Sequence, residues 1–268
     1  MACMTLIHID DPDDPRVSPY RDIRERDLVG RENRFIAEGR VVLDALLASP
    51  RFEAESLLLL ENRVPGLEAT LRKVPPGLPV YVASRQVIDA IAGFPLHRGI
   101  MALGRRKPVP DALQLLAAMP HRALVLVLVG IANHDNVGSI FRNAAAFGAD
   151  AVFLDASCCD PLYRKSIRVS VGAALRVPYA TFADEDDFHA ALAAHGFDAF
   201  ALSPRGARDL REVAQGEQTA LYLGTEGAGL PGALLERMTT LRIAMRDGFD
   251  SLNVAAASAV AMHHFFRG

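Results

Sequence analysis

Beyond residue 121, short apolar runs alternate with segments of helix length, and this alternation most constrains the fold. Apolar runs of strand length fall near Ala123–Val129, Ala151–Leu154, Tyr179–Phe182, Ala199–Leu202, Ala220–Leu223 and Leu241–Ala244. Helices are predicted near Val137–Phe147, Pro161–Val171, Glu185–His195, Leu230–Glu236 and Val254–Phe266. Strands separated by helix-length segments predict an α/β fold with a mostly parallel sheet and helices on both faces.

The first 107 residues predict a smaller α/β domain. Its first twenty residues carry three prolines and are expected to be irregular, and apolar residues at helical spacing predict a helix from about Asn33 to Ser49. Three strands and one short helix are then predicted at Leu57–Leu60, Val80–Ala83, Gly99–Leu103 and Arg85–Ile91. Because Pro108 and Pro110 disfavour helix at the residues before them, we expect a linker there. The predicted division is a domain at 1–107, a linker at 108–120 and a domain at 121–268.

Composition narrows the class of protein. The 268 residues are 50% hydrophobic, which is enough for two domains with sizeable cores. No apolar run approaches the roughly 20 residues that span a bilayer, and the acidic N-terminus lacks the features of a signal peptide. The three cysteines form neither a disulfide framework nor a Cys-x-x-Cys metal pair. We therefore expect a cytoplasmic protein with reduced thiols, no bound metal and no membrane partner.

The net charge of −3 does not by itself indicate nucleic acid, but basic residues cluster locally. One cluster is Arg105-Arg106-Lys107, and another lies in residues 161–183, which contain four cations and no acid. The arginine-rich composition suits bidentate phosphate contacts, although it is also typical of a genome of biased base composition. The candidate RNA-binding residues are Arg40, Arg105, Arg106, Lys107, Arg164, Lys165 and Arg168.

Three stretches of the C-terminal half place glycine or a small polar residue where an apolar run ends. They are Asn136-Val-Gly138-Ser-Ile-Phe-Arg142-Asn143-Ala144, Leu221-Tyr-Leu-Gly224-Thr-Glu226-Gly227-Ala-Gly229-Leu230, and Ile243-Ala-Met245 continuing to Ser251-Leu252-Asn253-Val254-Ala255. Ligand sites of α/β proteins lie at such carboxyl ends of strands. In this order, the three stretches resemble the signature motifs of the SpoU/TrmH family of RNA ribose 2'-O-methyltransferases, which have the SPOUT knotted fold.

The resemblance implies a fold, a reaction and an assembly. The C-terminal domain would be a SPOUT-type knotted sheet, and the stretch Phe35-Ile-Ala-Glu38-Gly39-Arg40-Val41 is similar to the substrate-binding domain that precedes it in many SpoU enzymes. The reaction would be methylation of a ribose 2'-hydroxyl in structured RNA by S-adenosylmethionine. The extra N-terminal domain favours ribosomal over transfer RNA. The family is usually homodimeric, with the active site at the dimer interface.

The resemblance also implies roles for individual residues. The catalytic set would be Arg142, Asn136, Glu226, Ser251 and Asn253. The cofactor contacts would be Leu223, Gly224, Ile243, Met245 and Leu252. From the residues alone, the position of Asn136 favours a helix N-cap, and Ser251 and Asn253 could cap the last helix while facing a ligand. Arg142 follows Gly138 by one turn on a helix of apolar and small residues, which favours burial beside a ligand over a solvated outer face.

The chemistry limits what Arg142 can do. Accounts of the family make this arginine the general base, but arginine is essentially always protonated in proteins. We therefore expect Arg142 to stabilise the developing alkoxide and a flanking phosphate, while the proton leaves to that phosphate or to water.

The sequence disfavours two other kinds of enzyme. Gly227, Gly229 and Gly232 match a dinucleotide-binding fingerprint, but only 21 residues follow Asp247, too few for the rest of a doubly wound domain. A serine hydrolase is disfavoured because the chain has no Gly-x-Ser-x-Gly elbow. The alternative to an enzyme is a non-catalytic RNA-binding dimer of the same fold.

Overall fold

The structure is a computed structural model that describes residues 5–21, 25–93, 95–225 and 227–266. It contains two compact units. The N-terminal unit comprises residues 1–109 together with 162–176, and the C-terminal unit comprises residues 110–161 and 177–268. Within the described residues, no helix is both long enough and apolar enough to cross a membrane.

A seven-stranded sheet forms the centre of the C-terminal unit, in the order β10-β12-β9-β11-β6-β7-β8. Its strands are β6 (Ala123–Leu128), β7 (Ala151–Asp155), β8 (Tyr179–Phe182), β9 (Asp198–Leu202), β10 (Arg208–Asp209), β11 (Gln218–Leu223) and β12 (Thr239–Arg242). All pairings between these strands in the described part of the chain are parallel. The predicted mostly parallel α/β sheet is confirmed, and the short edge strand β10 is an addition to it.

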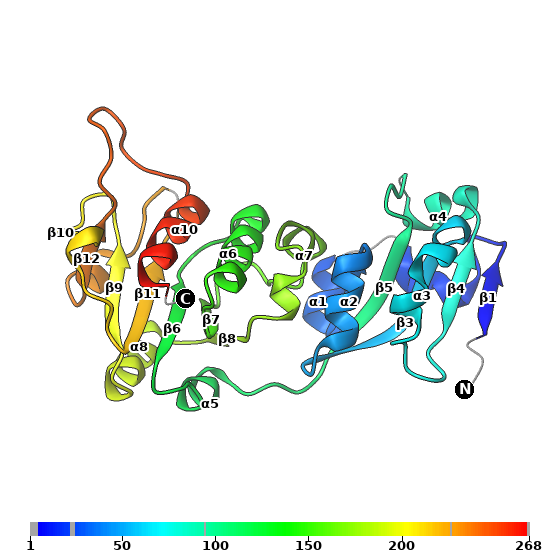
Figure 1. The fold of residues 1–268 in the computed structure, drawn as a ribbon, viewed down its shortest axis with the longest axis horizontal. Coiled ribbons are helices and arrows are strands. Elements are labelled where there is room, and N and C mark those ends of the chain that lie inside the picture. The colour runs from blue at the N-terminus through cyan, green and yellow to red at the C-terminus, as the bar shows by residue number, and fades with distance from the viewer. Residues whose placement is uncertain (1–4, 22–24, 94, 226, 267–268) are drawn as a thin grey trace. The chain divides into compact units, whose positions relative to one another are not determined.

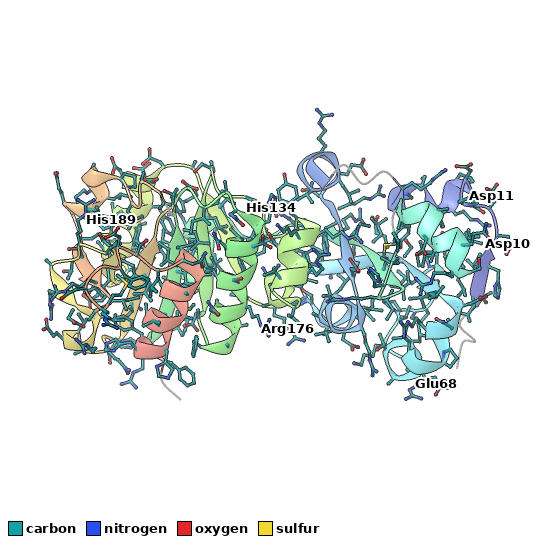
Figure 2. The ribbon with its side chains drawn as sticks, turned by 90° about the horizontal axis from the view of Figure 1, so that it is seen from above. Asp10, Asp11, Glu68, His134, Arg176 and His189 are labelled. Atoms are coloured by element: carbon teal, nitrogen blue, oxygen red, sulfur yellow. The ribbon has the colours of Figure 1, made fainter. Side chains whose placement is uncertain are left out.

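Helices cover both faces of this sheet (Figure 1). On one face, α5 (Ala112–Ala117) and α8 (Glu185–Ala194) pack against alternate strand residues such as Val125, Val127 and Phe153. On the other face, α6 (His134–Ala146) and α10 (Val254–Phe265) lie side by side. Figure 2 labels His134, at the start of α6, and His189, on α8. The short elements η4 (Leu210–Glu212) and α9 (Gly232–Leu235) complete the unit.

A five-stranded sheet in the order β1-β4-β3-β5-β2 forms the N-terminal unit. Its strands are β1 (Leu6–Ile9), β2 (Arg34–Glu38), β3 (Phe52–Leu60), β4 (Val80–Ala83) and β5 (Ile100–Arg106). Strand β5 runs antiparallel to both β2 and β3, while the other pairings are parallel. The remaining elements are η1 (Pro15–Tyr20), α1 (Glu25–Arg31), α2 (Arg40–Ala48), η2 (Glu61–Leu67), α3 (Glu68–Leu71) and α4 (Arg85–Ala92).

Two predictions for the N-terminal unit are wrong. The segment expected to be one helix from about Asn33 is a strand, β2, followed by α2, with Gly39 between them at a φ of 94°. Phe35, Ile36 and Ala37 are all buried in this strand, so a continuous apolar run was mistaken for part of a helical period. The first twenty residues, expected to be irregular, contain β1, which pairs with β4.

Two segments also differ from the predicted division into domains. The stretch 108–120, expected to be a linker, contains α5, whose N-terminus has a capping box between Asp111 and Gln114. The segment 162–176 follows strands of the C-terminal domain in sequence but packs in the N-terminal unit. It contains α7 (Arg164–Val169) and η3 (Ala173–Leu175), and α7 packs against β2.

Candidate active site

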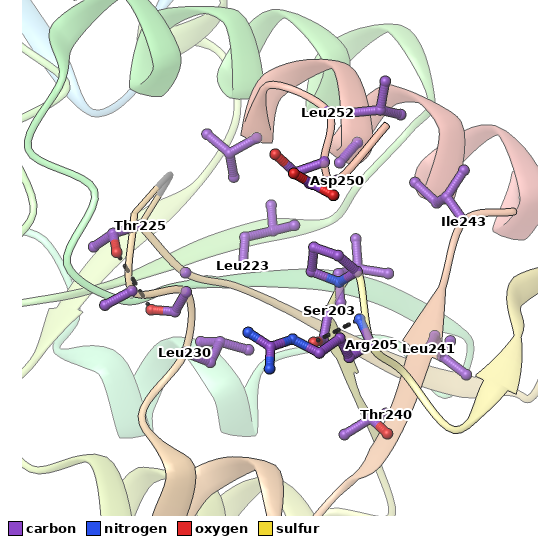
Figure 3. Close-up of a pocket in the computed structure, with 18 of the residues that line it drawn as sticks. Ser203, Arg205, Leu223, Thr225, Leu230, Thr240, Leu241, Ile243, Asp250 and Leu252 are labelled. Carbon is purple, nitrogen blue, oxygen red and sulfur yellow. Dashed lines mark hydrogen bonds between the residues drawn. The ribbon is translucent and has the colours of Figure 1, made fainter. Parts of the chain in front are cut away.

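A cavity of about 1130 Å³ lies at the carboxyl ends of three neighbouring strands of the C-terminal unit (Figure 3). Residues after β9, β11 and β12 line it, together with the start of α10. Parallel strands bring their carboxyl ends to one edge of a sheet, where the following loops can surround a ligand. The cavity is therefore in the place where the sequence predicted a ligand site.

The residues predicted to contact a cofactor come together here. Leu223, Gly224, Ile243, Met245 and Leu252 all line the cavity, although they come from three separate segments. Figure 3 shows Leu223, Ile243 and Leu252 around the cavity. Ser251, predicted to be catalytic, also lines it. The sequence therefore identified three of the four segments that form the wall.

Close backbone packing explains the glycine at position 224. A Cβ atom added to Gly224 would lie 2.4 Å from the carbonyl carbon of Gly229 and 2.4 Å from the nitrogen of Leu230. The loop folds back on itself here, because the amide nitrogen of Gly229 donates to the carbonyl oxygen of Thr225 at 3.1 Å. The cavity wall at this point is bare backbone. Glu226, predicted to be catalytic, lies outside the described residues.

The fourth segment of the wall was not predicted. Ser203, Pro204 and Arg205 follow β9 and line the cavity, and Figure 3 labels Ser203 and Arg205 there. A serine–proline pair directly after the apolar run Ala199–Leu202 was the available signal, of the same kind as in the predicted stretches. Phe249 and Asp250, on the loop before α10, also line the cavity, and Phe249 is 73% exposed.

Asn136 and Asn253 are joined to each other and do not line the cavity. The side-chain nitrogen of Asn253 donates to Oδ1 of Asn136 at 2.9 Å, and Asn136 is buried. Oδ1 of Asn253 accepts from the backbone nitrogens of Ala255 and Ala256, so Asn253 is the N-cap of α10. The alternative interpretation of Asn136 as a helix cap is wrong, because Asn133 caps α6. The amide pair thus connects the start of α10 to the first turn of α6.

Arg142 is exposed on α6 and does not line the cavity of its own chain. The buried face of α6 is formed by its other side, including Val137, Ile140, Phe141 and Ala144. The expected burial of Arg142 beside a ligand is therefore wrong for the single chain. The apolar residues that suggested burial lie on the opposite face of α6, which packs on the sheet. Arg142 shares the exposed face with two small residues, Ala145 and Ala146.

A compact polar turn occupies the neighbouring strand ends of β6 and β7. Oδ2 of Asp155 accepts from the backbone nitrogen of Gly130 at 3.0 Å and from the hydroxyl of Ser157 at 2.7 Å. Burial and the hydrogen bond with Asp155 raise the pKa of the Cys158 thiol well above its usual range. Cys158 is therefore a structural thiol. In the described part of the chain, no group of three or more His, Cys, Asp or Glu side chains could hold a metal ion.

The predicted RNA-binding residues have different surroundings. Arg105 is exposed but pairs with two glutamates, Glu53 at 2.5 Å and Glu55 at 3.0 Å. Arg164 is largely buried, and its Nη2 lies 2.8 Å from Oε2 of Glu38, so the prediction that Arg164 contacts RNA is not supported by its position. Its charge is already compensated inside the N-terminal unit. Three others are exposed: Arg40, Lys165 and Arg168. Two are partly buried: Arg106 and Lys107.

Known proteins resemble both the sequence and the structure. A relative from Mycobacterium bovis named as an uncharacterized tRNA/rRNA methyltransferase is 42% identical over 94% of this chain and 89% of its own. The Bacillus subtilis 23S rRNA guanosine 2'-O-methyltransferase RlmP is 26% identical over 93% of this chain and 95% of its own. An rRNA methyltransferase structure from Sinorhizobium meliloti has a TM-score of 0.81 at 24% identity, covering 97% of each chain, and shares the fold.

The family itself is identified by a match along the sequence. The model of the SpoU rRNA Methylase family matches residues 123–263, which include all four segments of the cavity wall. The match begins at the first residue of β6 and extends into α10. This chain belongs to the SpoU rRNA methylase family.

Proposed function

We propose that this chain transfers the methyl group of S-adenosylmethionine to a ribose 2'-hydroxyl of ribosomal RNA. The observation that carries the proposal is the cavity in which the separate predicted cofactor segments meet. Relatives support the substrate class, because the similar proteins from Bacillus subtilis and Acinetobacter baylyi are named as 23S rRNA 2'-O-methyltransferases. We propose the cytoplasm, where ribosomal RNA is modified, as the place of action.

The residues around the cavity fit this cofactor. Apolar side chains such as Leu223, Ile243 and Leu252 suit the faces of a purine, and the bare backbone at Gly224 allows close hydrogen-bonded approach. Arg205 offers a positive charge for a carboxylate, and Ser251 offers a hydroxyl. When bound, the cofactor supplies a methyl group on a positively charged sulfur.

Arg142 would act on the ribose oxygen. Transfer would form a bond between the ribose oxygen and the methyl carbon while the bond from that carbon to the positively charged sulfur breaks, so the site must hold the reacting atoms in line and exclude water. A protonated guanidinium beside the ribose oxygen stabilises the charge that develops there and can hold a flanking phosphate. The proton of the hydroxyl then leaves to that phosphate or to water. Asn136 and Asn253 would position α6 and the cofactor loop relative to each other rather than touch the reacting atoms.

The position of Arg142 supports a homodimer as part of the proposal. Arg142 does not line the cavity of its own chain, and the exposed surface near it and on α10 has small or apolar residues, including Ala145, Ala146 and Val260. We propose that a second copy covers this surface and that Arg142 serves the cavity of the partner. The family's knotted chain path stays a prediction from the resemblance.

Mapping of 2'-O-methylated nucleotides tests the proposed function. Total RNA from cells with and without the gene should differ at one or a few sites of ribosomal RNA, and purified protein with S-adenosylmethionine should restore them on unmodified RNA. Protein that binds RNA but never methylates it would instead support a non-catalytic RNA-binding dimer. Cofactor titration separates the two, since only an enzyme needs S-adenosylmethionine.

A further inference from the structure

We propose that a groove in the N-terminal unit, at the start of α2, binds the phosphate backbone of RNA. Its basic side chains are Arg40, Arg63, His97 and Arg98, of which the three arginines carry a positive charge. The inference rests on the proposed function and adds to it the surface by which the N-terminal unit contacts its substrate. Of these residues, only Arg40 was a candidate from sequence, because the others lie far apart along the chain.

The groove has a volume of about 420 Å³ and is lined by basic residues from three segments. Arg40 begins α2, Arg63 lies in η2, and His97 and Arg98 precede β5. All four side chains are exposed, and among the described residues that line the groove there is no acid. A concave surface with one sign of charge concentrates ligands of the opposite sign.

Among the described residues, Arg63 and Arg98 contact neutral carbonyl oxygens and Arg40 contacts a carboxylate only at long distance, whereas Arg105 of the same unit pairs closely with carboxylates. Nη2 of Arg63 donates to the carbonyl oxygen of His97 at 3.4 Å, and Nη1 of Arg98 donates to the carbonyl oxygen of Glu38 at 3.4 Å. Both partners are neutral, so the guanidinium charges persist. Arg40 makes a single long contact with Asp44, at 3.9 Å. Arg105, in contrast, pairs with two glutamates.

The backbone at the start of α2 adds a second source of positive potential. Gly39 is the N-cap, and among the described residues no side chain caps this helix. The first N–H groups of a helix point out of its N-terminus and favour an anion. A Cβ at Gly39 would lie 3.0 Å from both Cδ and Nη1 of Arg98, so glycine leaves room for that side chain beside the helix start.

The rim of the groove favours a nucleic acid over a free anion. Val41 is 49% exposed and Val171 is 38% exposed, and both line the groove. Apolar atoms beside cations match the sugar and base edges beside each phosphate of a strand. The planar guanidinium forks bind phosphate oxygens bidentately. The ligand is therefore a phosphodiester chain and not an isolated phosphate.

Salt-dependent binding of full-length protein to in vitro transcribed 23S rRNA tests the groove. The double variant Arg63→Gln/Arg98→Gln keeps the aliphatic stems and removes two charges. The control, Arg16→Gln/Arg72→Gln, removes two exposed charges of the same unit at residues that neither line the groove nor belong to the predicted RNA-binding set. Each lost phosphate contact should reduce the slope of log affinity against log salt by about 0.7 to 0.9, so the groove variant should lose about 1.4 to 1.8. The control should keep the wild-type slope.

Two further measurements separate this inference from the proposed function. Affinity for S-adenosylmethionine should be the same in wild type and in both variants, because the cofactor cavity lies in the other unit. Arg63→Lys/Arg98→Lys should recover most of the salt slope. An equal loss of salt slope in the groove and control variants, or no loss of slope in either, would overturn the proposal that the groove binds RNA. Wild-type protein that binds this RNA without methylating it would contradict the proposed function. The salt slopes of the groove and control variants would still decide whether the groove binds RNA.

Discussion

Arg142 is exposed on α6 and makes no contribution to the buried face of that helix, so its removal should spare the fold. If Arg142 stabilises charge on the ribose oxygen, Arg142→Ala should slow methyl transfer on the order of 100- to 1000-fold at unchanged S-adenosylmethionine affinity. Arg142→Lys keeps the charge but loses the planar fork, so it should recover little. Single-turnover rates at saturating RNA measure the effect. Near-wild-type rates in Arg142→Ala would show that Arg142 is an ordinary surface arginine.

Asn253 combines two roles that substitution can separate. Asn253→Ala should cost about 1 kcal/mol for the lost cap of α10. It should cost a further 1 to 3 kcal/mol, roughly, because Oδ1 of buried Asn136 loses its donor. Asn253→Ser keeps a capping oxygen but is too short to reach Asn136, so it should lose only the second part.

Equilibrium unfolding in urea measures these free energies. Asn133→Ala is the matched control, since it removes the cap of α6 and leaves the amide pair in place. A serine variant as stable as wild type would mean that the bond between Asn136 and Asn253 adds nothing to stability.

At the scale of elements, the turn after β11 depends on backbone contact at Gly224. In Gly224→Ala the new methyl group would meet backbone atoms of Gly229 and Leu230 at 2.4 Å, so the loop must move. Such overpacking typically costs about 1 to 3 kcal/mol. If the cofactor binds only the original shape of the loop, affinity for S-adenosylmethionine should fall by roughly 5- to 150-fold.

Gly232→Ala is the control for this loop. Gly232 also lines the cavity, but a Cβ there meets nothing within 4 Å, and the residue begins helix α9. Alanine should leave affinity unchanged and slightly stabilise the helix. Calorimetric titration of both variants checks the difference. Equal affinity in both would show that the cofactor does not depend on the shape of this turn.

The sequence predicted best those strands and helices whose hydrophobic pattern fits one kind of element and has clear ends. β4 and β8 have the predicted bounds, because each is a four-residue run of apolar, aromatic or β-branched residues between clear breaks. β2 was missed because its apolar residues were grouped with those of α2 in one helical period, although Glu38, Gly39 and Arg40 separate the two sets. Three segments of the cavity wall were predicted because glycine or a small polar residue lies at the end of an apolar run. Ser203-Pro204 after β9 is a signal of the same kind, but a serine–proline pair is also typical of an ordinary turn, and Arg205 was missed.

At the scale of the whole molecule, sequence order did not predict which segments share a core. Residues 162–176 lie between two strands of the C-terminal sheet, yet they pack with residues of the N-terminal unit. Arg164 is buried against Glu38, and the hydroxyl of Ser49 donates to the carbonyl oxygen of Leu175 at 3.2 Å. Periodicity describes only local structure, so it could not place a segment against a partner more than a hundred residues away. For the same reason, the sequence did not reveal that Arg164 pairs with Glu38, and Arg164 was predicted to contact RNA.

A double-mutant cycle across Glu38 and Arg164 tests this long-range packing. Their side chains are 8% and 14% exposed, so removing one partner leaves a buried charge, at a typical cost of about 3 to 5 kcal/mol. Glu38→Leu and Arg164→Met should each be strongly destabilising in urea. The double variant places two apolar side chains together and should cost far less than their sum. The exposed pair of Arg34 and Glu32 is the control, with an expected coupling of about 0 to 1 kcal/mol. Additive costs at Glu38 and Arg164 would mean that residues 162–176 do not pack against β2 in solution.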